Sequence, residues 1–255
     1  MTVARAAVVL GASGSVGRAL LTELIASRAF RTIVTLGRRT QPEYADMAEK
    51  AGVLLREVLV ADMDAPGLAT ATEDVCRSLT EEVVVGFSVL GVGAGTARLT
   101  LDQHRAVDVL LNGAFARGLR ASGRVVHLAF MSSVGADPRA SASGSGAAGS
   151  SRYLRVKGES EEAVKEAGPT VVSIFRPAMI IGSRHTPWLL EKVLPWFAFA
   201  TPSRFRSITV TQIARAMIAL SLRQPAASGV YHFAEMIAAG RAGETDQDGA
   251  MDELT

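Results

Sequence analysis

Short apolar runs alternate with longer helical patterns along most of the chain, and this alternation limits the fold more than any other feature. The apolar runs lie at residues 6–10, 32–36, 53–58, 82–90, 124–131 and 170–175. Most are apolar throughout, as strands are when both faces of their sheet are covered. The helical patterns lie between them, near 15–28, 67–79, 100–121 and 152–167. Because strands and helices alternate, the sequence predicts an α/β fold: a doubly wound, Rossmann-like parallel sheet with right-handed crossovers.

The pattern loosens after Phe175. An aromatic stretch at 186–202 precedes a helical pattern near 210–222 and a short strand, GVYHF. The length of the chain suffices for one substantial core with a small appended lobe. We therefore expect one domain over 1–238, in which 177–238 form a small C-terminal lobe.

Three segments are predicted to lie outside the packed core. RASASGSGAAGSS (139–151) is of low complexity and predicts a mobile loop. Residues 239–255 are acidic and poor in apolar side chains, which predicts a disordered tail. The aromatic stretch fits a substrate lid, a dimer surface, a membrane-contacting helix or packing under the sheet edge. Its large side chains are Trp188, Trp196, Phe197 and Phe199.

Three glycines punctuate the first strand–helix junction, VVLGASGSVGRALL (8–21). Gly11 permits a tight turn, Gly14 lets the backbone approach a pyrophosphate, and Gly17 lets the helix pack close to the strand. The helix N-terminus adds the positive end of its dipole. This position predicts a dinucleotide-binding turn rather than an ordinary glycine-rich one. Its other members are Ser13, Ser15 and Val16.

The end of the second strand favours NADP over NAD. An NAD site places Asp or Glu here for the ribose hydroxyls, but the segment reads VTLGRRT. Arg38 and Arg39 take that place, and a guanidinium pairs with a 2′-phosphate rather than a diol. The alternative is a pair of solvated arginines at a strand end. Further residues predicted to line the cofactor are Asp62 and Met63 at the adenine, and Leu90 and Gly91 after the fourth strand.

Tyr153 and Lys157 are four residues apart in SRYLRVKGESEEAV, so they share one helix face after the fifth strand. A phenol with an ordinary pKa near 10 exchanges its proton poorly at neutral pH unless a neighbouring ammonium lowers that pKa. Lys157 can supply this charge and also reach the nicotinamide ribose. In MSSVGA, Ser133 can hydrogen-bond the carbonyl oxygen where charge develops, with Ser132 as the fallback.

Together, the glycine motif, the serine after the fifth strand and YxxxK resemble the short-chain dehydrogenase/reductase superfamily. LGRRT, SSVGAD, YLRVKGESEEAV and SIFRPAMIIG resemble more closely an atypical branch of it, the oxidoreductase-like proteins that interact with HIV Tat. This similarity runs over nearly all of residues 5–220. It implies that Tyr153 is the proton donor and acceptor, and that Lys157, Arg38 and Arg39 bind NADPH. It also implies that Arg176 and Pro177 lie beside the nicotinamide.

The chain departs from the superfamily pattern at two places. Many members carry a catalytic Asn before the fifth strand, but the matching segment VDVLL offers Asp108. A proton relay through this position therefore does not carry over. The loop at 139–151 is also longer and richer in Gly and Ser than the resemblance leads us to expect.

We therefore predict an NADPH-dependent reductase of a small carbonyl compound, with 1–238 as the NAD(P)-binding domain and 177–238 as its substrate-side lobe. The main rival is a regulatory or interaction protein that binds NADPH with little or no turnover. A nucleotide-sugar epimerase shares the chemistry but needs a larger C-terminal domain. A protein partner or a homodimer fits either of the first two functions.

Composition and charge exclude several other functions. The formal net charge of +2 creates no field that would collect nucleic acid. Cys76 is the only cysteine and the four histidines are scattered, so we expect neither a disulfide nor a metal site. The apolar stretches are shorter than the roughly 20 residues that span a bilayer. The first strand begins too near Met1 for a signal peptide, so we expect a cytoplasmic protein.

Overall fold

The computed structural model describes residues 3–182 and 205–252, and its centre is a parallel sheet of seven strands. The strand order is β3-β2-β1-β4-β5-β6-β9, and every neighbouring pair is parallel. The strands are β1 (Arg5–Leu10), β2 (Thr32–Gly37), β3 (Leu54–Leu59), β4 (Val83–Ser88), β5 (Val125–Met131), β6 (Val171–Phe175) and β9 (Gly229–Tyr231). The predicted α/β class is confirmed.

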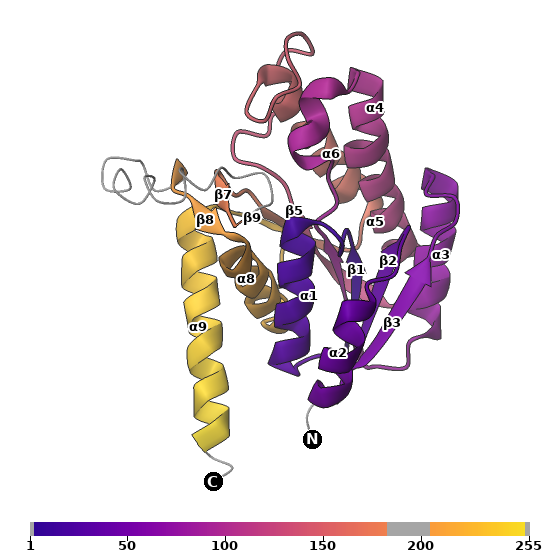
Figure 1. Cartoon of the computed structure of the whole chain (residues 1–255), viewed down its shortest axis with the longest axis vertical. Helices are drawn as coiled ribbons and strands as arrows, with labels where there is room; N and C mark the ends of the chain where they lie inside the picture. Colours follow the sequence, from indigo (N-terminus) through magenta and orange to yellow (C-terminus); the bar gives the residue numbers. More distant parts are fainter. Residues whose placement is uncertain (1–2, 183–204, 253–255) are drawn as a thin grey trace.

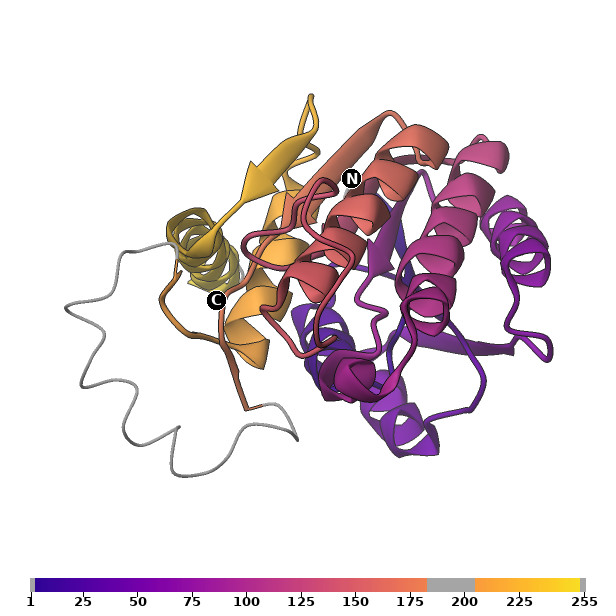
Figure 2. The same cartoon turned by 90° about the horizontal axis from the view of Figure 1, so that it is seen from above.

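Helices cover both faces of the sheet (Figures 1 and 2). On one face, α3 (Ala65–Ser78), α5 (Asn112–Ala121) and α6 (Ser151–Ala167) pack side by side. On the other face, α1 (Ser15–Ser27) packs against α8 (Val210–Leu222), which in turn packs against α9 (Phe233–Asp252). The sheet is therefore doubly wound, as its alternating pattern predicted.

Strand β1 shows how the sequence builds two cores. Successive strand side chains point to opposite faces. Ala7 and Val9 accordingly join the core under α1 and α8, whereas Ala6, Val8 and Leu10 join the core under α3 and α5. All five are fully or almost fully buried, which explains why this strand carries no polar side chain between them.

One long helical stretch contains a change of pitch. It begins with α4 (Leu101–Arg105), continues through a π-helical segment, η3 (Ala106–Leu111), and ends with α5. Thr100 caps its N-terminus in a capping box with Gln103. π-Helical turns are rare and concentrate at functional sites.

Several short elements were not predicted. They are the 3₁₀ turn η1 (Pro42–Tyr44), helix α2 (Ala45–Ala51), the 3₁₀ turn η2 (Gly93–Arg98), and the pair β7 (Ile180–Ile181) and β8 (Ile208–Thr209). β7 and β8 form a separate two-stranded sheet, whereas β9 extends the main sheet beside β6. The C-terminal lobe is thus partly integrated into the main layers. The aromatic side chains from Trp188 to Phe199 lie outside the described residues.

The C-terminal region differs from the predicted tail. Helix α9 extends to Asp252, into the segment 239–255 for which the sequence predicts a disordered tail. The first part of α9 buries Met236 and Ala239 in the core that α8 also lines. Apolar anchoring at one end offsets the cost of ordering a polar helix, and composition alone did not reveal it.

Candidate active site

The residues predicted for the site directly follow strands of the sheet, so they lie at the edge formed by the carboxyl ends of the strands. Because the strands are parallel, the segments that follow them all start at that edge. The chain winds from β1 to β2 and β3 on one side and from β4 to β6 on the other, so the winding direction changes between β1 and β4. Open α/β sheets bind ligands at such points. The predicted residues there are Gly11 after β1, Arg38 after β2, Asp62 after β3, Gly91 after β4, Ser133 after β5 and Arg176 after β6.

In the turn after β1, two of the three glycines are required by the protein itself. Gly11 has φ +89°, and a Cβ on it would lie 2.6 Å from the backbone nitrogen of Leu90. A Cβ on Gly17 would lie 2.7 Å from the Cα of Ala12. At Gly14 the nearest atom would be 3.5 Å away, an ordinary contact distance. Packing within the protein therefore does not require glycine at position 14, just before α1 begins at Ser15.

The remaining residues of this turn differ in exposure. Ser13 is exposed, Ser15 is half-buried, and Val16 is buried in the core under α1. Ser13 and Ser15 thus have accessible surface, whereas the Val16 side chain serves packing.

Arg38 and Arg39 directly follow β2, and both side chains are exposed. Among the described residues, no ion pair involves either guanidinium. Asp62, which is exposed, and Met63, which is half-buried, follow the neighbouring strand β3. The edge of the sheet at β2 and β3 therefore carries two positive charges in solvent.

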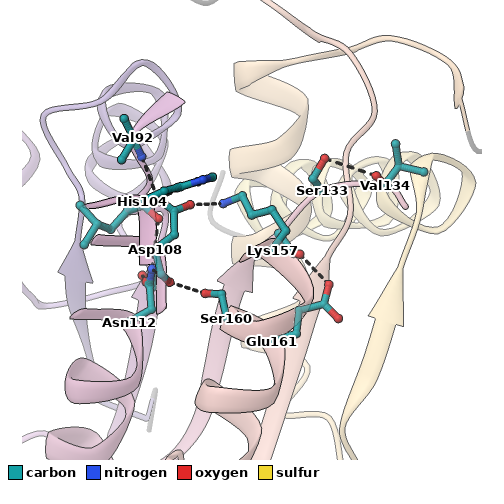
Figure 3. A network of polar contacts seen from close by, with 12 residues as sticks. Val92, His104, Asp108, Asn112, Ser133, Val134, Lys157, Ser160 and Glu161 are labelled. Carbon is teal, nitrogen blue, oxygen red and sulfur yellow. Dashed lines mark hydrogen bonds and ion pairs between the residues drawn. The ribbon is translucent and has the colours of Figure 1, made fainter. Parts of the chain in front are cut away.

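Helix α6 contacts the stretch of α4 and η3 through two pairs of side chains. Tyr153 and Lys157 lie one turn apart on α6, and His104 and Asp108 lie one turn apart on α4 and η3. The rings of His104 and Tyr153 stack, with centroids 5.9 Å apart and planes at 28°. One turn along, Nζ of Lys157 lies 2.9 Å from Oδ1 of Asp108. Figure 3 shows Asp108 pointing across the gap between the helices to Lys157.

Asp108 is held on several sides. Its Oδ2 accepts a hydrogen bond from the backbone N–H of Val92 at 3.1 Å. Its backbone carbonyl accepts hydrogen bonds from Nδ2 of Asn112, at 2.8 Å, and from Oγ of Ser160. Nε2 of His104 lies 3.7 Å from Oδ2, beyond hydrogen-bond distance. The carboxylate is therefore oriented toward Lys157 before any ligand binds.

The ion pair between Asp108 and Lys157 is buried, with side-chain exposures of 1% and 5%. Burial alone would lower the pKa of Lys157, but Asp108, together with Tyr153 and Glu161, holds that pKa above its usual range. Burial likewise opposes ionisation of Asp108, but Lys157 and, to a smaller extent, His104 hold the pKa of Asp108 below its usual range. Both groups are therefore charged at neutral pH.

The two serines after β5 have different surroundings. Ser132 is buried, and its Oγ donates a hydrogen bond to Oε1 of Glu161 at 2.5 Å. Ser133 is half-buried, and its Oγ makes only a long contact of 3.4 Å with the carbonyl of Val134. Ser133 is therefore the hydroxyl more able to turn to a ligand.

Arg176 and Pro177, predicted beside the nicotinamide, tie the end of β6 to its neighbours. Arg176 donates two hydrogen bonds to the carboxylate of Glu161, at 2.8 and 2.6 Å. The carbonyl of Pro177 accepts from the backbone N–H of Val134 at 2.9 Å. The side chain of Arg176 is thus engaged with α6, and its contribution here is to position the ends of β5 and β6.

Sequence reasoning did not single out His104, Asn112, Ser160 or Glu161. A signal for His104 was present, because His104 and Asp108 repeat the i, i+4 spacing of Tyr153 and Lys157. Spacing alone does not reveal which two helix faces meet. The contacts of Ser160 and Glu161 depend on the packing of α6 against η3 and β5.

The structure also contains a cavity away from this edge. It encloses about 500 Å³ between α8 and α9, lined by residues that include Arg206, Arg215, Arg241, Phe233, Met236 and Ile237. None of the predicted site residues lines it. Arg215 there pairs with Glu23 of α1 at 2.9 Å.

The chain resembles known proteins in sequence and in fold. No family model matches the sequence. The chain is 32% identical over 191 residues to the mitochondrial protein Fmp52 of Emericella nidulans, covering 75% of this chain and 73% of the relative. The chain belongs to the Fmp52 family. It is also 28% identical over 217 residues to HTATIP2 of Rattus norvegicus, covering 82% of this chain and 78% of the relative.

The fold agrees with this assignment. A short-chain dehydrogenase/reductase from Serratia marcescens superposes with a TM-score of 0.64 at 16% identity, covering 91% of this chain and 98% of that chain. At this identity the likeness concerns the fold alone. This member of the Fmp52 family thus resembles HTATIP2 in sequence and has the fold of a short-chain dehydrogenase/reductase.

One expectation is contradicted by the comparison. The sequence was predicted to be cytoplasmic, but the Fmp52 relatives from Emericella nidulans, Aspergillus niger and other fungi are named as mitochondrial proteins. The prediction rested on the position of the first strand, which carries no information about this family's compartment. In the described part of this Fmp52-family chain, no helix has the length and apolar character needed to cross a membrane.

Proposed function

We propose that this protein is an NADP-dependent oxidoreductase that reduces a small carbonyl compound with Ser133, Tyr153 and Lys157. The observation that carries the proposal is a buried, positively charged Lys157 one helical turn from Tyr153. A buried charge is costly unless it is paired, as Lys157 is with Asp108, and ionisable groups with perturbed pKa values concentrate at catalytic sites.

The cofactor expected by the proposal fits the sheet edge. Gly14 is exposed and carries no side chain, so a pyrophosphate could approach the backbone there, next to the N-terminus of α1. The exposed Arg38 and Arg39 would hold the 2′-phosphate of NADPH. Gly91 supports the same placement, because a Cβ there would lie 3.3 Å from Nζ of Lys157. With glycine at 91, the ammonium can approach a ribose in this position.

Each residue has a distinct part in the reduction. NADPH, when bound, supplies the hydride that adds to the carbonyl carbon. Tyr153 gives its hydroxyl proton to the carbonyl oxygen, which leaves a phenolate and an alcohol product. Lys157 favours this proton loss by placing a positive charge near the phenolate, and Ser133 donates a hydrogen bond to the same carbonyl oxygen.

One observation favours a second candidate function. Position 108 carries an aspartate where the superfamily resemblance leads to a catalytic asparagine, and this carboxylate is in direct contact with Lys157. A regulatory protein that binds NADPH without turnover would need the cofactor residues but not the hydroxyl of Tyr153. Consumption of NADPH with a panel of aldehydes, ketones and quinones separates the two functions.

A further inference from the structure

We propose that Asp108 is a positioning residue for this reaction, whose carboxylate fixes the ammonium of Lys157 in place and keeps it charged. This inference rests on the proposed function, in which Lys157 acts on Tyr153 and the cofactor. Asp108 belongs to neither the glycine turn nor the Ser133, Tyr153 and Lys157 set.

The backbone around Asp108 is built to aim the carboxylate. The π-helical segment η3 brings Asp108 to the side of the helix that faces α6. Ser160 of α6 donates a hydrogen bond to its backbone carbonyl, which ties η3 to α6, and Asn112 of α5 donates a second one to the same oxygen. The backbone N–H of Val92 holds the second carboxylate oxygen at 3.1 Å. The other carboxylate oxygen, Oδ1, lies 2.9 Å from Nζ of Lys157.

Gly91 adds a steric requirement for the same pair. A Cβ at position 91 would lie 3.2 Å from Oδ1 of Asp108 and 3.3 Å from Nζ of Lys157. Both distances are tighter than most real Cβ contacts, so a side chain here would press on both members of the pair. The loop after β4 thus keeps room for this contact.

Of the described titratable groups around Lys157, Asp108 is the one that pairs with its ammonium. From α6, Tyr153 and Glu161 face it, and Glu161 is already engaged with Arg176 and Ser132. From α4, His104 contacts Asp108 rather than Lys157. The loop after β4 contributes the backbone of Gly91 and Val92, which carries no charge. Among the described residues, Asp108 is the carboxylate that forms an ion pair with Lys157.

Removal of this carboxylate would leave a buried ammonium without its counter-ion. Buried lysines without a partner lose their proton at pH values several units below the ordinary lysine pKa. The charge of Lys157 would then depend on pH in the neutral range. A neutral lysine supplies no field that favours proton loss from Tyr153, so turnover would decline as pH rises.

The test compares Asp108→Asn with Glu159→Gln in the full-length protein. Glu159 is a matched control, because it is an ion-paired carboxylate on α6 that contacts Arg105 and Arg155 rather than Lys157. We would measure NADPH affinity by calorimetry and NADPH oxidation between pH 6 and pH 9. As pH rises from 6 to 9, turnover and NADPH affinity should both fall in Asp108→Asn, by about tenfold or more relative to the change in the parent. In Glu159→Gln, the pH dependence should match that of the parent.

The inference is overturned if Asp108→Asn shows the parent's pH dependence in both measurements. If the parent binds NADPH but turns over no substrate, the proposed function fails, and the affinity measurement still decides the inference. If NADPH does not bind, unfolding in urea decides it without a ligand. Asp108→Asn should then be less stable at pH 7 than the parent, and adding Lys157→Met should restore part of the loss. A double variant no more stable than Asp108→Asn would overturn the inference.

Discussion

Gly17 lies directly against Gly11, because a Cβ on Gly17 would overlap the carbonyl oxygen of Gly11. Gly14, between them, has no such contact, and a Cβ there would lie 3.5 Å from the same oxygen. The three glycines of one motif therefore serve two purposes. Gly11 and Gly17 allow the chain to fold tightly, whereas at Gly14 we propose that glycine makes room for the cofactor.

This difference predicts opposite results for two substitutions. Gly14→Val should leave the unfolding temperature within a few degrees of the parent and abolish measurable NADPH binding, because its side chain fills the space for the pyrophosphate. Gly17→Ala should instead destabilise the fold by about 1–3 kcal/mol, the usual cost of overpacking. Thermal unfolding and calorimetric titration of both variants check this. Undiminished NADPH binding by Gly14→Val would remove the predicted site.

Cofactor preference is predicted from the end of β2. Because Arg38 and Arg39 stand where a carboxylate would bind ribose hydroxyls, NADPH should bind about tenfold or more tightly than NADH, a difference of roughly 1.4 kcal/mol. Arg38→Asp should erase or invert the preference by replacing an attraction for the 2′-phosphate with a repulsion. Calorimetric titration with both cofactors measures it, and equal affinities in the parent would contradict the assignment.

The strand and helix order could be predicted from sequence because this sheet is buried on both faces. In β1, for example, every residue after Arg5 is apolar. The segment of α6 likewise has a clear helical pattern, and Ser150 caps it. Helix α9 was missed because its buried residues, Met236 and Ala239 in the part with described side chains, are few and contact a core that α8 also lines. Pattern reasoning detects burial along one element but not burial that two distant elements create together.

The candidate site shows the same limit. Tyr153 and Lys157 were found because their spacing and their place after β5 are local features of the sequence. The partner of Lys157 was not predicted, since Asp108 reaches it through a π-helical turn that brings η3 against α6. Neither the turn nor the facing of the two helices has a clear sequence signature.

The buried His127 should make the free energy of unfolding depend on pH in mild acid. It is buried on β5, with Nε2 2.9 Å from Oγ of Ser173 on β6, and burial lowers its pKa from 6.5 to about 4. Because the unfolded chain binds a proton more readily, His127 stabilises the fold fully above pH 6.5. This contribution, about 3 kcal/mol at most, is lost as pH falls from 6.5 to 4.

The test is urea unfolding at several pH values for the parent and for His127→Asn, which does not titrate in this range. Between pH 7 and pH 4, the parent should lose more free energy of unfolding than the variant does. Equal losses would mean that His127 does not couple protonation to folding.

Lys157 is predicted to act on both binding and chemistry. Lys157→Ala removes the charge next to Tyr153 and a contact for the nicotinamide ribose, so it should weaken NADPH affinity and turnover together. It also leaves Asp108 buried without its counter-ion, which should lower the stability of the fold. Calorimetry, initial rates and urea unfolding separate these effects. A variant with full NADPH affinity would show that Lys157 does not contact the cofactor.

The most direct test of the central claim is NADPH oxidation by the parent and by Tyr153→Phe, measured across a broad panel of aldehydes, ketones and quinones. Phenylalanine keeps the ring that stacks on His104 but removes the proton that the carbonyl oxygen receives. With a substrate that the parent reduces, Tyr153→Phe should turn over about 10²-fold or more slowly at nearly unchanged NADPH affinity. Parent-like turnover in Tyr153→Phe would contradict the mechanism, and a parent that binds NADPH but reduces no compound of the panel would contradict the enzymatic function.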